Sequence, residues 1–168
     1  MIRMVHRKVP ILCAILLIFI SCRDQHRILD RFEPIPNRAW ETANQPEMTV
    51  HVSDNKVPHT IYVNLRHTHQ YRYANIHLRM HVFSASDSGE VHLPAKEIKR
   101  IQLRLAENDG RWLGKQQGNL YTLQKPILKN YYFPDTGKFV IRMEQFMRDN
   151  PLEHVTEVGL RIDQNEPL

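Results

Sequence analysis

Cysteine is almost absent from this chain, and so are several motifs that would mark an enzyme. Only Cys13 and Cys22 occur among the 168 residues, which excludes a small domain stapled by several disulfides and a metal site built from cysteines. No Gly-Lys-Ser/Thr phosphate loop and no Gly-x-Ser-x-Gly nucleophile turn is present. Gly110, Gly114 and Gly118 recur at four-residue intervals without such an ending, and we expect them to make a loop flexible.

The chain also lacks an apolar run of the ~20 residues that a membrane-spanning helix needs. Its apolar run over 11–20 is short, and Ser21-Cys22 follows at once. The residues before this run include Arg3, Arg7 and Lys8. A basic head, a short apolar core and a small residue at the cleavage point are features of a secretory signal peptide.

The string LLIFISC, which ends at Cys22, resembles a bacterial lipobox, with Phe19 where leucine is more usual. In that class of signal the cysteine is acylated and becomes the mature N-terminus. We therefore predict a signal peptide over 1–21, lipidated Cys22 with a polar linker over 22–38, and one domain over 39–168. Each buried methylene contributes ~0.8 kcal/mol, so two or three chains such as palmitate give stable membrane attachment. The alternative is an ordinary secretory signal cut elsewhere, with Cys22 incidental.

The charges of the mature chain are nearly balanced. The whole sequence has 23 basic and 18 acidic residues, and three of the basic ones lie in the predicted leader, which leaves 20 against 18. Nucleic-acid binding needs a clustered basic footprint, so we expect no nucleic-acid partner.

Period-two alternation of apolar and polar residues dominates the mature chain and predicts half-buried strands. The clearest case is 75–83, where apolar residues at the even positions 76–82 alternate with polar residues at the odd positions 75–81. The segment 101–105 also fits one face of a helix. The predicted strands are 48–52, 61–65, 75–83, 101–105, 139–144 and 158–163. The turn residues that separate them lie at 53–55, 86–89, 108–110 and 134–137.

Several short strands with one apolar face each predict an all-β fold. We expect a two-layer antiparallel β-sandwich, with a jelly roll as one form of it. One short helical turn is expected at 151–155.

Histidine is unusually frequent, with ten in the chain. His67 and His69 would project on one side of a strand, as two metal ligands do. His77 and His81 share a strand face with Arg79, but lie roughly 13 Å apart in a regular strand, too far to share one ion. The interpretation we favour is solvated or cross-strand-paired imidazoles, with no metal, no other cofactor and no catalytic residues.

Aromatic residues outside the alternating stripes form the candidate contact site. Tyr71, Tyr73 and Trp112 fall at loops or strand ends, and Arg111 precedes the tryptophan. Exposed, these rings would stack on a sugar or anchor a protein interface. The alternative, which we favour for Trp112, is that it plugs the end of the sandwich core.

Four tracts together resemble the GldH family of gliding-motility lipoproteins of Bacteroidetes, and their order and spacing agree with it. The tracts are YVNLRHTHQYRYANIHLRM (62–80), DGRWLG (109–114), FPDTGKFVIRMEQFMRDN (133–150) and TEVGLRID (156–163). The resemblance implies an envelope lipoprotein that works beside a multi-protein motor and the type IX secretion apparatus, with no assigned catalytic activity. It carries over one site residue, the lipidated Cys22.

The leading hypothesis is therefore a non-catalytic structural or interaction component, held to a membrane by its N-terminal lipid and contacting other envelope motility or secretion proteins. Arg23 after the cysteine favours the outer membrane, since some inner-membrane lipoproteins carry an acidic residue there. The alternative is an envelope-anchored carbohydrate-binding module that uses Tyr71, Tyr73 and Trp112. A metal-dependent enzyme that uses the histidines is a third, minor hypothesis.

Overall fold

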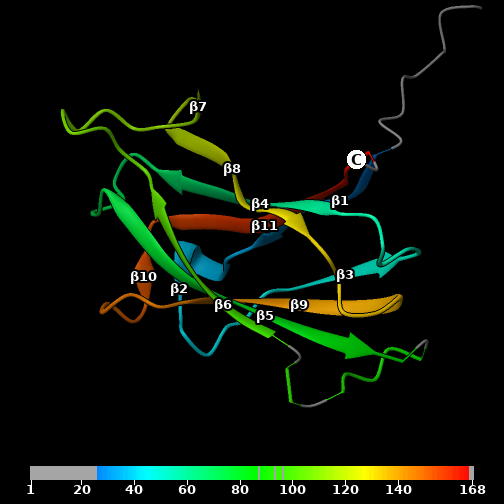
Figure 1. Ribbon diagram of the computed structural model, residues 1–168. Coiled ribbons are helices and arrows are strands. Elements are labelled where there is room, and N and C mark those ends of the chain that lie inside the picture. The colour runs from blue at the N-terminus through cyan, green and yellow to red at the C-terminus, as the bar shows by residue number, and fades with distance from the viewer. Residues whose placement is uncertain (1–25, 87, 93, 96, 167–168) are drawn as a thin grey trace, which may run out of the picture.

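The alternating segments form strands of two facing antiparallel sheets in the computed structural model (Figure 1). The structure describes residues 26–86, 88–92, 94–95 and 97–166, so the predicted leader and Cys22 lie outside the described residues. The elements are β1 (Arg27–Pro34), the 3-10 turn η1 (Pro36–Arg38), β2 (Ala39–Trp40), β3 (Glu47–Val52), β4 (His59–Thr68), β5 (Asn75–Ala85), β6 (Glu97–Arg104), β7 (Lys115–Gln117), β8 (Leu120–Tyr131), β9 (Gly137–Gln145), β10 (Leu152–Glu153) and β11 (Val155–Gln164). Within the described part of the chain, no helix is long and apolar enough to span a membrane.

The strand order is that of a jelly roll. One sheet has the order β1-β11-β4-β8-β7 and the other β3-β9-β5-β6, and all their pairings are antiparallel. Without the short β2, β7 and β10, the eight long strands, numbered along the chain, follow 1-8-3-6 in one sheet and 2-7-4-5 in the other. This order confirms the predicted sandwich and its jelly-roll form.

The core fills the space between the two sheets with the apolar residues of the alternating stripes. On β5 the inward residues Ile76, Leu78, Met80 and Val82 are all at most 1% exposed. They face Ile61, Val63 and Leu65 of β4 and Val158, Leu160 and Ile162 of β11, which are fully buried. Fully buried Trp40, on β2, closes one end through the small β2–β10 sheet.

The predicted linker over 22–38 is wrong from Arg27 onward. The segment Arg27–Pro34 is strand β1, which pairs with β11 at the edge of the five-stranded sheet. Backbone hydrogen bonds to β11 hold this strand without an alternating apolar stripe, so its sequence resembles that of a polar linker. Ile35 is 4% exposed and belongs to the core, which places the start of the folded domain near residue 27 rather than 39.

Two further local expectations are corrected. The predicted helical turn at 151–155 is absent, because β10 pairs Leu152 with Trp40 and β11 begins at Val155. The ambiguous segment 101–105 lies in strand β6 up to Arg104.

Gly114 has a structural role that differs from the predicted loop flexibility. Gly110, Gly114 and Gly118 all have positive φ, a turn conformation that side chains disfavour. At Gly114 a Cβ would also come within 2.4 Å of the carbonyl oxygen of Thr122 on β8. Glycine here therefore allows a defined turn and a close backbone approach.

Candidate functional site

Three of the four predicted contact residues meet at one end of the sandwich. Tyr71 and Tyr73 lie in the loop between β4 and β5, and Trp112 lies in the segment between β6 and β7. The Tyr71 ring centroid lies 5.9 Å from that of Tyr73 and 6.3 Å from that of Trp112. His67 from β4 and Tyr121 from β8 complete the group, with centroids 4.7 Å and 6.1 Å from Trp112.

The geometry of this aromatic group supports the core-plug interpretation of Trp112. Tyr71 is 3% exposed, and Trp112 and Tyr73 are half-buried against the core. The planes of Tyr71 and Trp112 meet at 55°, and those of Tyr71 and Tyr73 at 73°. Stacking on a sugar needs exposed and roughly coplanar rings, which this arrangement does not offer. The Tyr73 hydroxyl donates a hydrogen bond to Asp149 instead.

The fourth predicted residue, Arg111, makes its described polar contacts within its own turn. It is exposed, and its guanidinium contacts Asp109 at 3.1 Å. Hydrogen bonds from the Arg111 backbone and side chain hold the pKa of Asp109 below its usual value. This pair stabilises the turn before Trp112.

His67 is buried rather than solvated, and its ring stacks on that of Tyr121, its cross-strand partner on β8, with the centroids 5.7 Å apart. Its Nδ1 lies 2.9 Å from the carbonyl oxygen of Thr68, and since a carbonyl only accepts, we assign the ring proton to Nδ1. Burial lowers the pKa of His67, and the hydrogen bond with Thr68 only partly opposes this. Among the described residues, Nε2 has no hydrogen-bond partner. The ring is therefore a neutral member of the aromatic group.

The expected pairing of His67 with His69 on one strand side does not form. β4 ends at Thr68, and His69 is exposed beyond it. Within the described ranges, no group of three His, Cys, Asp or Glu side chains is placed to hold a metal ion.

The outer face of the four-stranded sheet carries more positive than negative charge. Among described residues, its cations are Arg79, Arg100, Arg104, Lys138 and Arg142, and its carboxylates are Glu47 and Glu144. The Nε2 atom of His81 lies 2.8 Å from Glu144 on the neighbouring strand β9, which confirms cross-strand pairing for this histidine. The guanidinium group of Arg79 also contacts Glu144 and lies over the exposed ring of Phe146.

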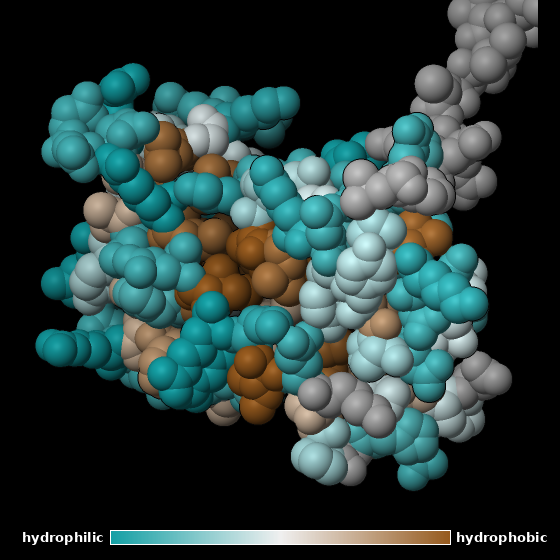
Figure 2. Space-filling model, viewed as in Figure 1, coloured by the Kyte–Doolittle hydropathy of each residue, from teal (hydrophilic) through white to brown (hydrophobic). Residues whose placement is uncertain are grey.

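Among the described residues, no backbone ladder joins the two sheets along the side where β6 and β8 face each other. β6 is an edge strand, and β8 from Leu123 onward pairs with β4 alone in the described part of the chain, because β7 covers no more than Leu120–Thr122. Figure 2 shows apolar surface gathered in a hollow between the two layers on this side. We call this hollow the β6–β8 groove. It has a volume of about 260 Å³ and is lined by 99–103 and 125–128.

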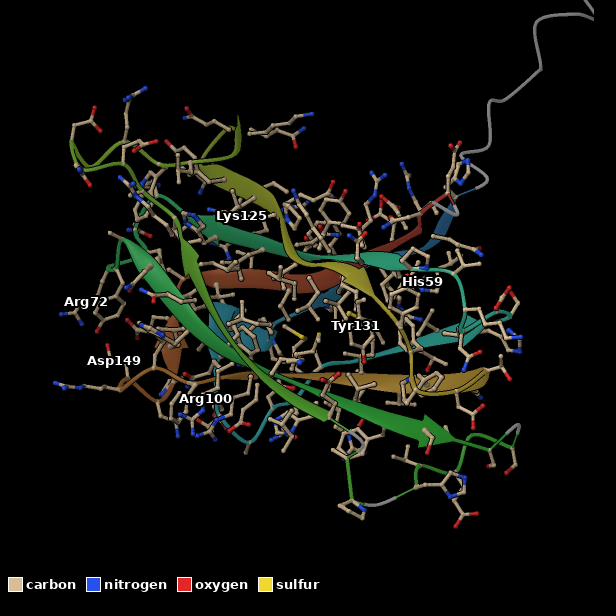
Figure 3. All side chains as sticks on the ribbon, viewed as in Figure 1. His59, Arg72, Arg100, Lys125, Tyr131 and Asp149 are labelled. Carbon is tan, nitrogen blue, oxygen red and sulfur yellow. The ribbon has the colours of Figure 1, made fainter. Side chains whose placement is uncertain are left out.

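Tyr131 and Glu97 connect β8 to β6 at one end of the groove. The Tyr131 hydroxyl donates a 2.7 Å hydrogen bond to Glu97, which also contacts Lys99. Burial and this hydrogen bond raise the pKa of Tyr131 far above its usual value. Burial alone would raise the pKa of Glu97, but hydrogen bonds from Lys99 and Tyr131 lower it. Arg100 of β6 and Lys125 of β8 lie at the rims of the groove (Figure 3).

Sequence reasoning missed the β6–β8 groove, because its two walls lie more than twenty residues apart in the chain. β8 was not predicted as a strand, since Pro126 and two register shifts interrupt its alternation. The apolar residues Leu123, Ile127 and Leu128 were the available signal, together with a long chain segment without strong turn residues.

The comparisons with known proteins bear out the family resemblance that the four tracts carry. The profile of the GldH lipoprotein family matches residues 27–162. The chain is 27% identical over 166 residues to the gliding motility lipoprotein GldH of Flavobacterium johnsoniae, covering 93% of this chain and 95% of the relative. It is 24% identical over 160 residues to a gliding motility lipoprotein GldH homolog of Christiangramia forsetii, covering 90% and 91%. No solved structure gives a significant match.

Proposed function

Because the chain belongs to the GldH lipoprotein family, we propose that it is a lipid-anchored envelope component of the gliding-motility and type IX secretion machinery, acting by contact rather than catalysis. The observation that carries this proposal is the family match, which extends over almost the whole described sandwich. The names of two relatives, one in a Flavobacterium and one in a Christiangramia species, support a part in gliding motility.

The proposed membrane tether is the acylated Cys22, which lies only five residues before β1. A tether this short would keep the sandwich close to its membrane, since five extended residues span at most ~18 Å. Because Arg23 directly follows the cysteine, we propose that the lipid tether lies in the outer membrane. The protein surface, rather than a cofactor, would then carry the function.

The test compares Cys22→Ala with Cys13→Ala in cells that make the protein. Each variant removes one cysteine, but Cys13 lies within the predicted leader and leaves no trace in the mature chain. We expect Cys22→Ala to move the folded domain out of the membrane fraction and to abolish its co-purification with motility components. Cys13→Ala should behave as the natural protein does. A Cys22→Ala chain that stays in the membrane fraction would contradict the lipid tether.

A further inference from the structure

Strand β6 presents an unused row of backbone hydrogen-bonding groups. Among the described residues, β6 pairs with β5 alone. The amide of Leu105 donates to the Ala74 carbonyl, and the amide of Phe146 donates to the His77 carbonyl on the other side of β5. Hydrogen-bonded pairs alternate along an antiparallel ladder, so the His77–Gln102 pair is a non-bonded one. The N–H and C=O groups of Arg100 and Gln102 therefore point away from β5, toward the open side.

The groove beside this edge exposes apolar side chains that a further strand would cover. Ile127 and Leu128 of β8 are half-buried against the core, and Ile101 of β6 is 9% exposed. A strand added to β6 extends the four-stranded sheet across the groove. Its inward side chains would then lie over these residues, as alternate side chains of a strand point to one face.

The rims of the groove carry positive charge. Arg100 is exposed on the outer face of β6, where an alternating strand would place its carboxylates, whereas Lys99 and exposed Lys125 lie on the groove side. Glu97, the carboxylate nearest to them on β6, already contacts Lys99 and Tyr131. An incoming strand is therefore matched by charge when it carries carboxylates next to its apolar residues.

The other free edges are less suited to receive a strand. β8 carries Pro126, which lacks an N–H donor, and bulged pairing on both sides of Ile61 interrupts its register with β4. β1 carries Pro34 at its end and is flanked by ion pairs of Arg27 and Arg31. β3, the opposite edge of the four-stranded sheet, also lacks proline, but it has only six residues and lies close to β1. β6 has eight residues and no proline, so it is the edge best able to pair.

We propose that the β6 edge binds an extended segment of a partner protein in which apolar and acidic residues alternate. The apolar residues of the segment fill the β6–β8 groove, and its carboxylates lie on the outer face beside Arg100. Backbone hydrogen bonds to Arg100 and Gln102 supply the pairing, as in other strand-addition complexes. This inference rests on the proposed function, since it names how the anchored protein makes its contacts.

The test uses the full mature protein and capped seven-residue peptides as probes. One peptide alternates Glu and Val, a second alternates Lys and Val, and a third has the composition of the first without alternation. We expect the alternating Glu/Val peptide to bind at least tenfold more tightly than either of the others. Hydrogen exchange should show it slowing the amides of Arg100 and Gln102. Equal binding of the Lys/Val peptide would overturn the proposal.

Matched variants at two edges of the same sheet locate the site. Gln102→Pro removes an outward N–H of β6. Thr49→Pro removes an outward N–H of β3 at the opposite edge, because the residues on either side of exposed Thr49 make the backbone hydrogen bonds to β9. We expect Gln102→Pro to weaken Glu/Val binding at least tenfold and Thr49→Pro to leave it unchanged. Arg100→Glu keeps the backbone and should reverse the preference toward Lys/Val. Undiminished binding in both β6 variants would refute the site.

Two outcomes separate this inference from the proposed function. If no peptide binds while the tethered chain still co-purifies with motility components, only the strand-addition proposal fails. If the natural protein sediments as a dimer that Gln102→Pro dissociates, a second copy occupies the edge and the partner assignment is overturned. The Cys22→Ala comparison does not involve β6, and it tests the proposed function by itself.

Discussion

At the scale of single residues, the buried ring of His67 links the stability of the fold to pH. Burial lowers its pKa in the folded chain, whereas the unfolded chain returns it to the ordinary value near 6.5. Above that pH both states are neutral and the full stability is present. As the pH falls below it, the unfolded state takes up a proton that the folded state refuses, and the free energy of unfolding decreases.

His67→Phe should therefore weaken the pH dependence of stability between pH 7.5 and 5.5. One such histidine contributes at most about 1.4 kcal/mol per pH unit. Burial also lowers the pKa of His59, so part of the dependence should persist. Denaturant unfolding at both pH values measures the effect, and His69→Phe is the control because His69 is exposed. An unchanged pH dependence in His67→Phe would show that this ring does not resist protonation.

The aromatic group around His67 shows how far the site could be predicted from the sequence. Tyr71, Tyr73 and Trp112 were singled out because they stand outside the strand pattern, and the structure brings them together. The half-buried position of Trp112 agrees with the core-plug interpretation, but the burial of Tyr71 could not be predicted, since it depends on β4 and β8 lying side by side. Tyr121 and the buried position of His67 follow from that same pairing.

At the scale of elements, Gly159 allows strand β1 to dock on β11. A Cβ at this position would lie 2.0 Å from the carbonyl oxygen of Arg31, a backbone atom of β1. Gly159→Ala should therefore push β1 away and lower the free energy of unfolding by about 1–3 kcal/mol. Hydrogen exchange of the β1 amides should become faster, as their pairing to β11 loosens.

Gly110→Ala is the matched control for that experiment. Nothing lies within 4 Å of a Cβ there, but φ is +84°, so its cost of about 1–2 kcal/mol arises in its own turn. The β1 amides should then exchange as in the natural protein. Identical β1 exchange in the two variants would mean that Gly159 is not needed for docking.

The strands that alternation predicted are those with one buried face, namely β3, β4, β5, β6, β9 and β11. The long strands it missed, β1 and β8, are held largely by backbone pairing to one neighbour. β1 has an irregular burial pattern, and Pro126 bends β8, so neither shows a clean period of two. Edge position alone does not cause this, since the edge strands β3 and β6 do alternate, and only β1 and β8 are not encoded by the side-chain pattern.

At the scale of the whole molecule, the jelly roll gives the chain two unlike sides. On one side β1 lies close to β3, and on the other the edges of β6 and β8 leave a groove open. The chain termini of the sandwich lie together, since the Gln164 amide donates to the His26 carbonyl where β1 begins (Figure 1). On the proposed account, a tether at this corner leaves the β6 edge available to partners.

Site-specific photocrosslinking in intact cells tests most directly whether this protein acts by contact. A photoreactive residue at Gln102 reports on the β6 edge, and one at exposed Thr49 reports on the opposite edge of the same sheet. The account predicts that Gln102 forms adducts with envelope motility or secretion proteins and that Thr49 does not. Equal adducts from both positions, or none from Gln102, would contradict it.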